Sequence, residues 1–258
     1  MTAPDTAGAG GPPGRRAALV TGAGSGIGRA VAGRLEQDGV DVLAVDLRPD
    51  PDGPGVPHQA DLCDAGANQA AVAAALERFG RLDIIVAGAG IQHVSPIQEF
   101  PVERWNLILA LMLTSPFLLA RSAWGALAQS PAGRFIAIAS AHSLAASPYK
   151  AAYVSAKHGV LGLVRTLALE GAEHGITATA VCPGYVRTPL VEAQIPDQAR
   201  AHGLSEEDAL EQVILAPHVI KDLIEPSEVA DVVAFLAGPG GRSFTGVPVT
   251  MDMGWTAR

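Results

Sequence analysis

A glycine-rich turn between an apolar strand and a helix constrains the fold of this chain more than any other stretch. The apolar run 17–21 leads into Gly22-Ala-Gly-Ser-Gly-Ile-Gly28, and residues 29–37 have helical character. Glycines let the backbone turn tightly and approach a pyrophosphate, and the N-terminus of a helix presents free N–H groups and a positive dipole to it. The turn therefore favours a dinucleotide site, although glycine-rich turns also occur for purely structural reasons.

Short apolar strands alternate with helical segments along the chain. The predicted strands cover residues 17–21, 40–45, a short segment ending at Asp61-Leu62, 82–87, 135–139, 176–181 and 247–251. This alternation, without hairpin signals, predicts an α/β fold. We expect a Rossmann-type, doubly wound, mostly parallel seven-stranded sheet with helices on both faces.

The domain organisation follows from changes in composition. Residues 1–14 are rich in Gly, Pro and Ala and lack the apolar core of a signal peptide, so they are predicted to be a disordered tail. The remainder, 15–258, is predicted to be a single NAD-binding catalytic domain in the cytoplasm. The polar, interrupted stretch at about 188–225 predicts a helical lid insert over cofactor and substrate, with a merely structural excursion as the alternative. Ser227 is expected to cap the helix that follows.

Composition and charge exclude several classes of partner. The formal net charge is −8, whereas nucleic acid and anionic membranes require a basic face, so neither is an expected partner. The apolar run 107–120 is too short for a membrane span and is interrupted by Pro116. Cys63 and Cys182 lack metal-site spacing, so we predict neither a metal site nor a disulfide.

Three side chains indicate acid/base chemistry at an alcohol or carbonyl carbon. Tyr153 and Lys157 are four apart in a helix-forming stretch, which places phenol and ammonium on one helix face. A tyrosine has a pKa of about 10, and a nearby positive charge favours its phenolate. Ser140 follows the predicted strand 135–139, whose carboxyl end opens toward the ligand crevice of an α/β sheet. An ordinary helix pair is the alternative interpretation of Tyr-x-x-x-Lys alone.

The acidic residues that follow two strands indicate which cofactor is bound. Asp46 stands eighteen residues after Gly28, where a carboxylate accepts hydrogen bonds from the adenosine ribose and repels a 2′-phosphate, so NAD is the predicted cofactor. Arg48 leaves tolerance of NADP open, or it is a solvated loop residue. Asp61 is placed to reach the adenine amino group, although Asp61 or Asp64 serves equally well as a helix cap.

Taken together, four motifs resemble the short-chain dehydrogenase/reductase family over nearly the whole chain beyond the tail. They are Thr21-Gly-x-x-x-Gly-Ile-Gly28, Ser140, Tyr153-x-x-x-Lys157 and Pro183-Gly184. Within the family, four further stretches resemble the bacterial D-3-hydroxybutyrate dehydrogenases. These are 91–101, 139–150, Cys182–Gln198 and Gly254–Ala257.

The resemblance implies roles for individual residues. Ser140, Tyr153 and Lys157 would be catalytic, and a small 3-hydroxy acid or 3-keto acid would be the substrate of a homotetramer built through the long-helix faces. The implied substrate-binding residues are Gln92, Ser140, His142, Lys150, Tyr153, Gln194 and Trp255. The implied NAD-binding residues are Thr21, Gly22, Ser25, Gly26, Ile27, Gly28, Asp46, Asp61, Leu62, Gly88, Gly90, Tyr153, Lys157, Pro183, Gly184, Val186 and Thr188.

The chain departs from the family pattern at three places. Met112 stands where the family has an asparagine that kinks the long helix and helps to hold a water joining the lysine to solvent. The Asn-Asn-Ala-Gly motif becomes Ala87-Gly-Ala-Gly90, and a Gly-Gly pair becomes Met253-Gly254. The alternatives are therefore an enzyme acting on another small alcohol or ketone, and an NAD-binding protein with an impaired catalytic site.

Overall fold

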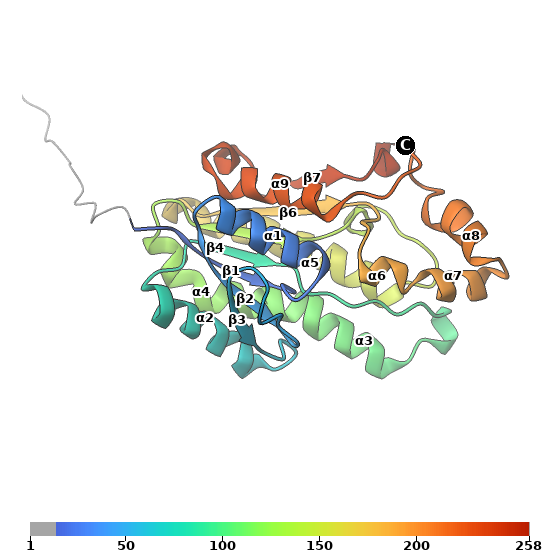
Figure 1. Ribbon diagram of the computed structural model, residues 1–258, viewed down its shortest axis with the longest axis horizontal. Helices are drawn as coiled ribbons and strands as arrows, with labels where there is room; N and C mark the ends of the chain where they lie inside the picture. The colour runs from blue at the N-terminus through green and yellow to red at the C-terminus, as the bar shows by residue number, and fades with distance from the viewer. Residues whose placement is uncertain (1–13, 258) are drawn as a thin grey trace, which may run out of the picture.

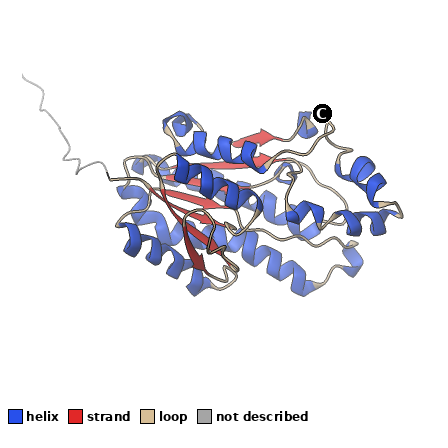
Figure 2. Cartoon of the chain, viewed as in Figure 1, coloured by secondary structure: helices blue, strands red, loops and turns tan. Residues whose placement is uncertain are grey.

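The computed structural model describes residues 14–257, so all of the predicted tail except Gly14 lies outside the described residues. Figure 1 shows how the strands and helices are arranged, and Figure 2 separates them by type. The strands are β1 (Ala17–Thr21), β2 (Asp41–Asp46), β3 (Val56–Gln59), β4 (Ile84–Ala87), β5 (Arg134–Ile138), β6 (Thr177–Pro183) and β7 (Pro248–Met251). The α-helices are α1 (Gly26–Gln37), α2 (Ala65–Phe79), α3 (Val102–Leu109), α4 (Ser115–Gln129), α5 (Ala151–Gly171), α6 (Pro189–Glu192), α7 (Ile195–His202), α8 (Glu206–Ala209) and α9 (Pro226–Ala237).

The strands form one seven-stranded sheet in the order β3-β2-β1-β4-β5-β6-β7, and every neighbouring pair is parallel. The predicted Rossmann-type, doubly wound sheet is confirmed. The order reverses between β1 and β4, and ligands of open α/β sheets bind in the crevice outside the carboxyl ends of the strands at such a switch point. In this topology a single strand, β4, separates β1, which leads into the glycine turn, from β5, which leads to Ser140.

Helices cover both faces of the sheet because its strands are apolar on both sides. In β1, Leu19 faces a core shared with α2, α4 and α5, whereas its neighbour Val20 faces a core shared with α1 and α9. Figure 1 shows α1 and α9 on one side of the sheet and α2 and α4 on the other. The helices α6, α7 and α8 lie together within the segment where a helical lid was predicted.

The long helical pattern predicted from Val102 is present, but it is not a uniform α-helix. A π-helical turn at Ala110–Thr114 joins α3 to α4. By length and composition the combined helix Val102–Gln129 would suffice to cross a membrane. In the fold it is a core helix, since Leu119 and Leu127 are buried between α2, α5 and the sheet.

The end of the third strand differs from the sequence prediction for a local reason. The third strand ends at Gln59 rather than at Asp61-Leu62, because Asp61 begins a turn by accepting the N–H of Cys63 at 3.0 Å. Asp64 then caps α2 by accepting the N–H of Ala67 at 2.8 Å.

The predicted Ser227 cap of α9 is wrong. Pro226 is the first helical residue, which suits a residue without an N–H, so Glu225 occupies the cap position. The carboxylate of Glu228 accepts the Glu225 N–H at 2.7 Å and closes a capping box.

Replacing Glu228 by alanine should therefore destabilise the protein by about 1 kcal/mol, since a cap hydrogen bond and a favourable charge in the first helical turn are both lost. The midpoint of thermal unfolding should fall by roughly 2–4 °C. The matched variant Ser227→Ala, one position earlier on the same exposed turn, should leave the midpoint unchanged. Equal losses in the two variants would contradict the assigned cap.

Candidate active site

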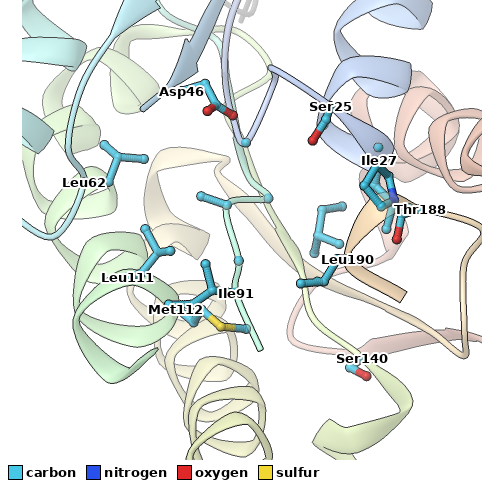
Figure 3. A pocket seen from close by; sticks show the side chains of 18 of the residues that line it. Ser25, Ile27, Asp46, Leu62, Ile91, Leu111, Met112, Ser140, Thr188 and Leu190 are labelled. Atoms are coloured by element: carbon cyan, nitrogen blue, oxygen red, sulfur yellow. The ribbon is translucent and has the colours of Figure 1, made fainter. Parts of the chain in front are cut away.

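A cavity of about 430 Å³ opens at the carboxyl edge of the sheet, and nearly all the predicted cofactor residues line it. Figure 3 shows Asp46 and Ser25 across from each other toward one end, Ser140 toward the other, and Thr188 and Leu190 between Ser25 and Ser140. Every predicted cofactor residue except Thr21 contributes to the wall, as do Ser140 and Met112. One continuous cavity thus joins the glycine turn to the catalytic candidates.

The glycine turn has the geometry that a phosphate-binding loop requires. Gly22 and Gly26 have φ angles of +73° and +52°, a region that residues with a Cβ rarely adopt. A Cβ on Gly28 would lie 2.2 Å from the carbonyl oxygen of Gly22, so the turn and the start of α1 touch backbone to backbone. The cavity therefore meets bare backbone and a helix N-terminus, which suits a pyrophosphate.

Thr21 does not line the cavity and instead supports it from behind. Its hydroxyl accepts the N–H groups of Gly88 at 2.9 Å and Ala89 at 3.2 Å, which ties the end of β1 to the loop after β4. The structure therefore places Thr21 as a buried support of the switch point rather than as a wall residue. Sequence spacing alone could not separate these two positions.

Asp46 is held rigidly at the adenosine end of the cavity. One carboxylate oxygen accepts the Gly24 N–H at 3.0 Å and the other accepts the Arg48 N–H at 2.9 Å. A Cβ on Gly24 would lie 2.9 Å from the Asp46 carboxyl carbon, so the glycine makes room for the carboxylate. The glycine turn, this fixed carboxylate and the elongated cavity together fit a dinucleotide.

The three catalytic candidates meet at the other end of the cavity. Ser140 follows β5, and Tyr153 and Lys157 project from α5. Lys157 Nζ lies 5.6 Å from the centre of the Tyr153 ring but donates to the carbonyl oxygen of Ile138 at 2.6 Å. The expected direct meeting of ammonium and phenol is therefore replaced by a hydrogen bond to the end of β5.

Burial changes the acidity of these groups. It raises the pKa of the Tyr153 phenol, while the Ser140 hydroxyl acts in the opposite direction by hydrogen bonding. Burial also lowers the pKa of Lys157 to about 8. The Ser140 hydroxyl therefore favours the Tyr153 phenolate through its hydrogen bond.

Met112 makes the neighbouring wall apolar. It is buried in the π-helical turn, packs with Ile108, Ala152 and Ala156, and faces the cavity beside Leu111 (Figure 3). The long helix is therefore distorted at this position without an asparagine. A thioether accepts hydrogen bonds weakly and donates none, so Met112 cannot hold water as an amide does.

Three of the predicted acid-binding residues gather in a buried cluster next to the catalytic end. Lys150 Nζ donates to Gln194 Oε1 at 3.1 Å, and burial lowers the pKa of Lys150 to about 8. His142 packs edge-on against the ring of Tyr153, with ring centres 5.6 Å apart. Burial and the charge of Lys150 lower the pKa of His142 to about 3, so its imidazole is neutral at physiological pH.

The other two predicted substrate residues have different surroundings. Trp255 joins the cluster, since its ring centre lies 4.8 Å from that of His142. Among residues 14–257 no hydrogen bond joins Gln92 to the cluster, and its side-chain oxygen accepts the N–H of His93 at 2.9 Å. The structure thus brings together His142, Lys150, Gln194 and Trp255, and a role of Gln92 in the acid site stays a prediction.

Sequence reasoning missed Tyr185, the aromatic residue at the centre of this cluster. Its hydroxyl accepts a hydrogen bond from Lys150 Nζ at 2.8 Å. Its ring stacks on Trp255, with ring centres 5.5 Å apart and an interplanar angle of 13°. Tyr185 belongs to the stretch Cys182–Gln198 that had already been singled out by resemblance. No charge or spacing pattern marks a single tyrosine there, so only the folded contacts identify it.

The parallel sheet, the glycine turn and the serine, tyrosine and lysine at one end of a single cavity define a nicotinamide-dependent oxidoreductase. The chain belongs to the short-chain dehydrogenase/reductase family, as its motifs predicted. A family model described as Enoyl-(Acyl carrier protein) reductase matches residues 22–256. Members of this family bind NAD(H) or NADP(H).

Individual proteins resemble the chain over almost its full length. A D-beta-hydroxybutyrate dehydrogenase of Rhizobium meliloti (strain 1021) is 43% identical, with 94% of this chain and 99% of that protein covered. A D-beta-hydroxybutyrate dehydrogenase of Cupriavidus necator is 39% identical, with 94% and 98% covered. Among solved structures, an actinorhodin polyketide ketoreductase with NADPH has a TM-score of 0.88 at 31% identity, with 95% and 98% covered.

The glycine turn supports a direct test of cofactor binding. The variant Gly28→Ala should weaken NADH and NADPH binding more than tenfold, because its Cβ would collide with the Gly22 carbonyl and displace the turn. Gly33→Ala is the matched control on the same helix, since its Cβ would meet only Pro54 at 3.7 Å. Fluorescence titration with each nucleotide measures both variants, and full affinity in Gly28→Ala would contradict the assignment.

Proposed function

We propose that the protein is an NAD-dependent dehydrogenase that interconverts D-3-hydroxybutyrate and acetoacetate. The buried Lys150 carries the proposal. Among residues 14–257 no carboxylate pairs with this ammonium, which donates to Tyr185 and Gln194 instead. A buried cation is costly without an anion, and a substrate carboxylate supplies one. The two relatives named as D-beta-hydroxybutyrate dehydrogenases support the same substrate.

Each residue around the cavity has a separate role in the proposed reaction. NAD held by the glycine turn and Asp46 would supply the acceptor for the hydride from C3 of the hydroxy acid. Tyr153 takes the hydroxyl proton as the carbon–oxygen double bond forms, and Ser140 holds the substrate oxygen. Lys157 favours the phenolate form of Tyr153 and would hold the nicotinamide ribose, while Thr188 would contact the carboxamide. His142, Lys150 and Gln194 would hold the carboxylate.

Asp46 supports the choice of NAD over NADP. Both of its carboxylate oxygens accept backbone N–H groups, from Gly24 and Arg48, so the negative charge cannot swing away from the adenosine end. A 2′-phosphate placed there would meet a fixed like charge. Arg48 lines the same end of the cavity, and its positive charge is of the sign that suits a 2′-phosphate, so NADP is assayed beside NAD.

We also propose a cytoplasmic homotetramer formed by a single catalytic domain over residues 15–258. The side chains of Phe117 on α4 and Leu169 on α5 are exposed by 45% and 81%. Large apolar groups on the long helices are suited to contacts between subunits. The segment 188–225, which contains α6, α7 and α8, is proposed as the lid over cofactor and substrate.

Met112 favours one alternative, an NAD-binding protein with impaired turnover. Its apolar side chain takes a place where the family has an amide, and Lys157 donates to a backbone carbonyl that cannot pass a proton onward. Against this alternative, the protein keeps Ser140, Tyr153 and an anion site that a cofactor-binding protein would not need. A catalyst for another small alcohol or ketone would likewise not need Lys150.

The decisive measurement is NADH formation from D- and L-3-hydroxybutyrate. Turnover should be selective for the D acid, at least tenfold faster with NAD than with NADP, and lowered at least a thousandfold in Tyr153→Phe with NADH binding retained. Binding of NADH without turnover of either acid would instead favour the impaired site, and turnover of uncharged alcohols alone would favour a different substrate.

The buried lysine of the acid site makes substrate affinity depend on pH. Because the pKa of Lys150 is about 8, its charge is present below pH 8 and lost above it. The KM for acetoacetate should therefore rise above pH 8, approaching tenfold per pH unit, whereas the KM for its methyl ester should stay level.

The variant Lys150→Arg separates this titration from others in the site. A guanidinium stays charged throughout, so its KM for acetoacetate should start higher, because the fit is poorer, but stay level with pH. Lys157 titrates in the same range but lies at the catalytic end, so its loss of charge should appear in kcat. A pH-dependent KM for acetoacetate in Lys150→Arg would contradict the proposed role of Lys150.

A further inference from the structure

Tyr185 is a fixed part of the molecule rather than a mobile wall. It follows β6 and leads into the proposed lid, and only 7% of it is exposed. Its ring stacks on Trp255, and its backbone N–H donates to Nε2 of His218 at 3.2 Å. His218 is fully buried and is held in turn by a hydrogen bond between Nδ1 and the Asp222 carbonyl at 2.9 Å. The Tyr185 hydroxyl is therefore held in one place.

Among the described residues, the hydroxyl proton of Tyr185 has no hydrogen-bond acceptor in the buried cluster. Lys150 Nζ has three N–H donors and uses two of them, on the Tyr185 hydroxyl oxygen and on Gln194 Oε1. The Gln194 amide nitrogen donates a hydrogen bond to the carbonyl oxygen of Leu190 at 2.8 Å. The Tyr185 oxygen already accepts from an ammonium, so its own proton is directed elsewhere, and no residue within 14–257 accepts it in a hydrogen bond.

We infer that the Tyr185 hydroxyl is a carboxylate-binding donor that sets the specificity of the site for short acids. An anionic oxygen next to Tyr185 would accept a hydrogen bond from this hydroxyl and a second one from the remaining N–H of Lys150. A hydroxyl that accepts from a cation is polarised and becomes a better donor to an anion. The inference rests on the proposed function, because it adds a residue to the proposed acid site.

The geometry also explains why the acid should be short. His142 packs against both the catalytic tyrosine and Tyr185, with ring centres 5.6 Å from Tyr153 and 6.4 Å from Tyr185. The place where the proton is taken and the place where the charge is held therefore adjoin the same imidazole. Trp255 closes the far side by packing on both His142 and Tyr185. A carboxylate joined to the reacting carbon through a single methylene group suits this arrangement.

Burial keeps Tyr185 in the form that donates. It raises the pKa of Tyr185 well above its ordinary value, and the neighbouring Tyr153 adds to the effect. The phenol is thus protonated at every pH at which the enzyme would work. Lys150 by contrast loses its charge near pH 8, so the two donors of the acid site respond differently to pH.

The test uses Tyr185→Phe, which removes the hydroxyl but keeps the ring that stacks on Trp255. Calorimetric titration of the protein saturated with NADH should show butyrate binding ten- to a hundredfold weaker than in wild type, as expected for losing one charge-assisted hydrogen bond. The KM for acetoacetate should rise by the same factor with kcat within twofold, and the KM for methyl acetoacetate should not change.

Tyr149→Phe is the matched control. It removes the hydroxyl of a tyrosine that is adjacent in sequence to Lys150. The ring of Tyr149 packs edge-on against His202, with ring centres 5.5 Å apart. Butyrate affinity and both KM values should be those of wild type. Thermal midpoint and NADH affinity, measured on both variants, identify any general damage to the fold.

A pH profile separates a direct role from a structural one. The Tyr185 oxygen accepts from the charged form of Lys150, so removing it should lower the pKa of that lysine. The rise in the KM for acetoacetate should then begin at a lower pH in Tyr185→Phe than in wild type. Unchanged butyrate affinity or an unshifted profile in Tyr185→Phe would overturn the inference.

The outcomes also distinguish this inference from the proposed function. If wild type binds butyrate but does not oxidise D-3-hydroxybutyrate, the proposed reaction fails, and Tyr185→Phe still decides the role of the hydroxyl by butyrate affinity. If wild type turns over the acid and Tyr185→Phe binds butyrate equally well, the reaction stands and the inference fails. If wild type with NADH does not bind butyrate, both the acid site and the inference are wrong.

Discussion

Everything proposed for this protein depends on one constraint, which is that parallel strands end at the same edge of a sheet. The glycine turn leaves β1, Asp46 ends β2, Ser140 follows β5, and Pro183 ends β6, all at that edge. Residues more than a hundred positions apart thereby line a single cavity. The hydroxyl of Thr21 strengthens the arrangement at its centre, because it binds the loop after β4 to the end of β1.

The parts that could be predicted from the sequence are those in which one residue type has one physical use. Alternating apolar strands and helices predicted the sheet, and the glycines of 22–28 predicted the turn, since the left-handed φ angles of Gly22 and Gly26 favour glycine. Asp46 lies at the cavity because it is the last residue of a parallel strand. In each case neighbours in sequence suffice to predict the local geometry.

The parts that could not be predicted depend on contacts between distant segments. Lys157 and Tyr153 share a helix face as expected, yet the ammonium bonds to Ile138 on a different element. Gln92 is implied by resemblance in the acid site, and its side-chain oxygen accepts the N–H of the adjacent His93, a contact that no spacing pattern predicts. Tyr185 joins the cluster only because β6 and the segment around Lys150 are brought together by the fold.

The two buried lysines have different hydrogen-bond partners, which suit the different tasks proposed for them. Burial lowers the pKa of each to about 8, so their difference does not lie in acidity. Lys157 donates to a backbone carbonyl beside the cavity, which fixes it near Tyr153. Lys150 donates to two polar side chains, Tyr185 and Gln194, that a carboxylate can join without displacing either. The first arrangement holds a charge near the catalyst, whereas the second leaves donors for a substrate.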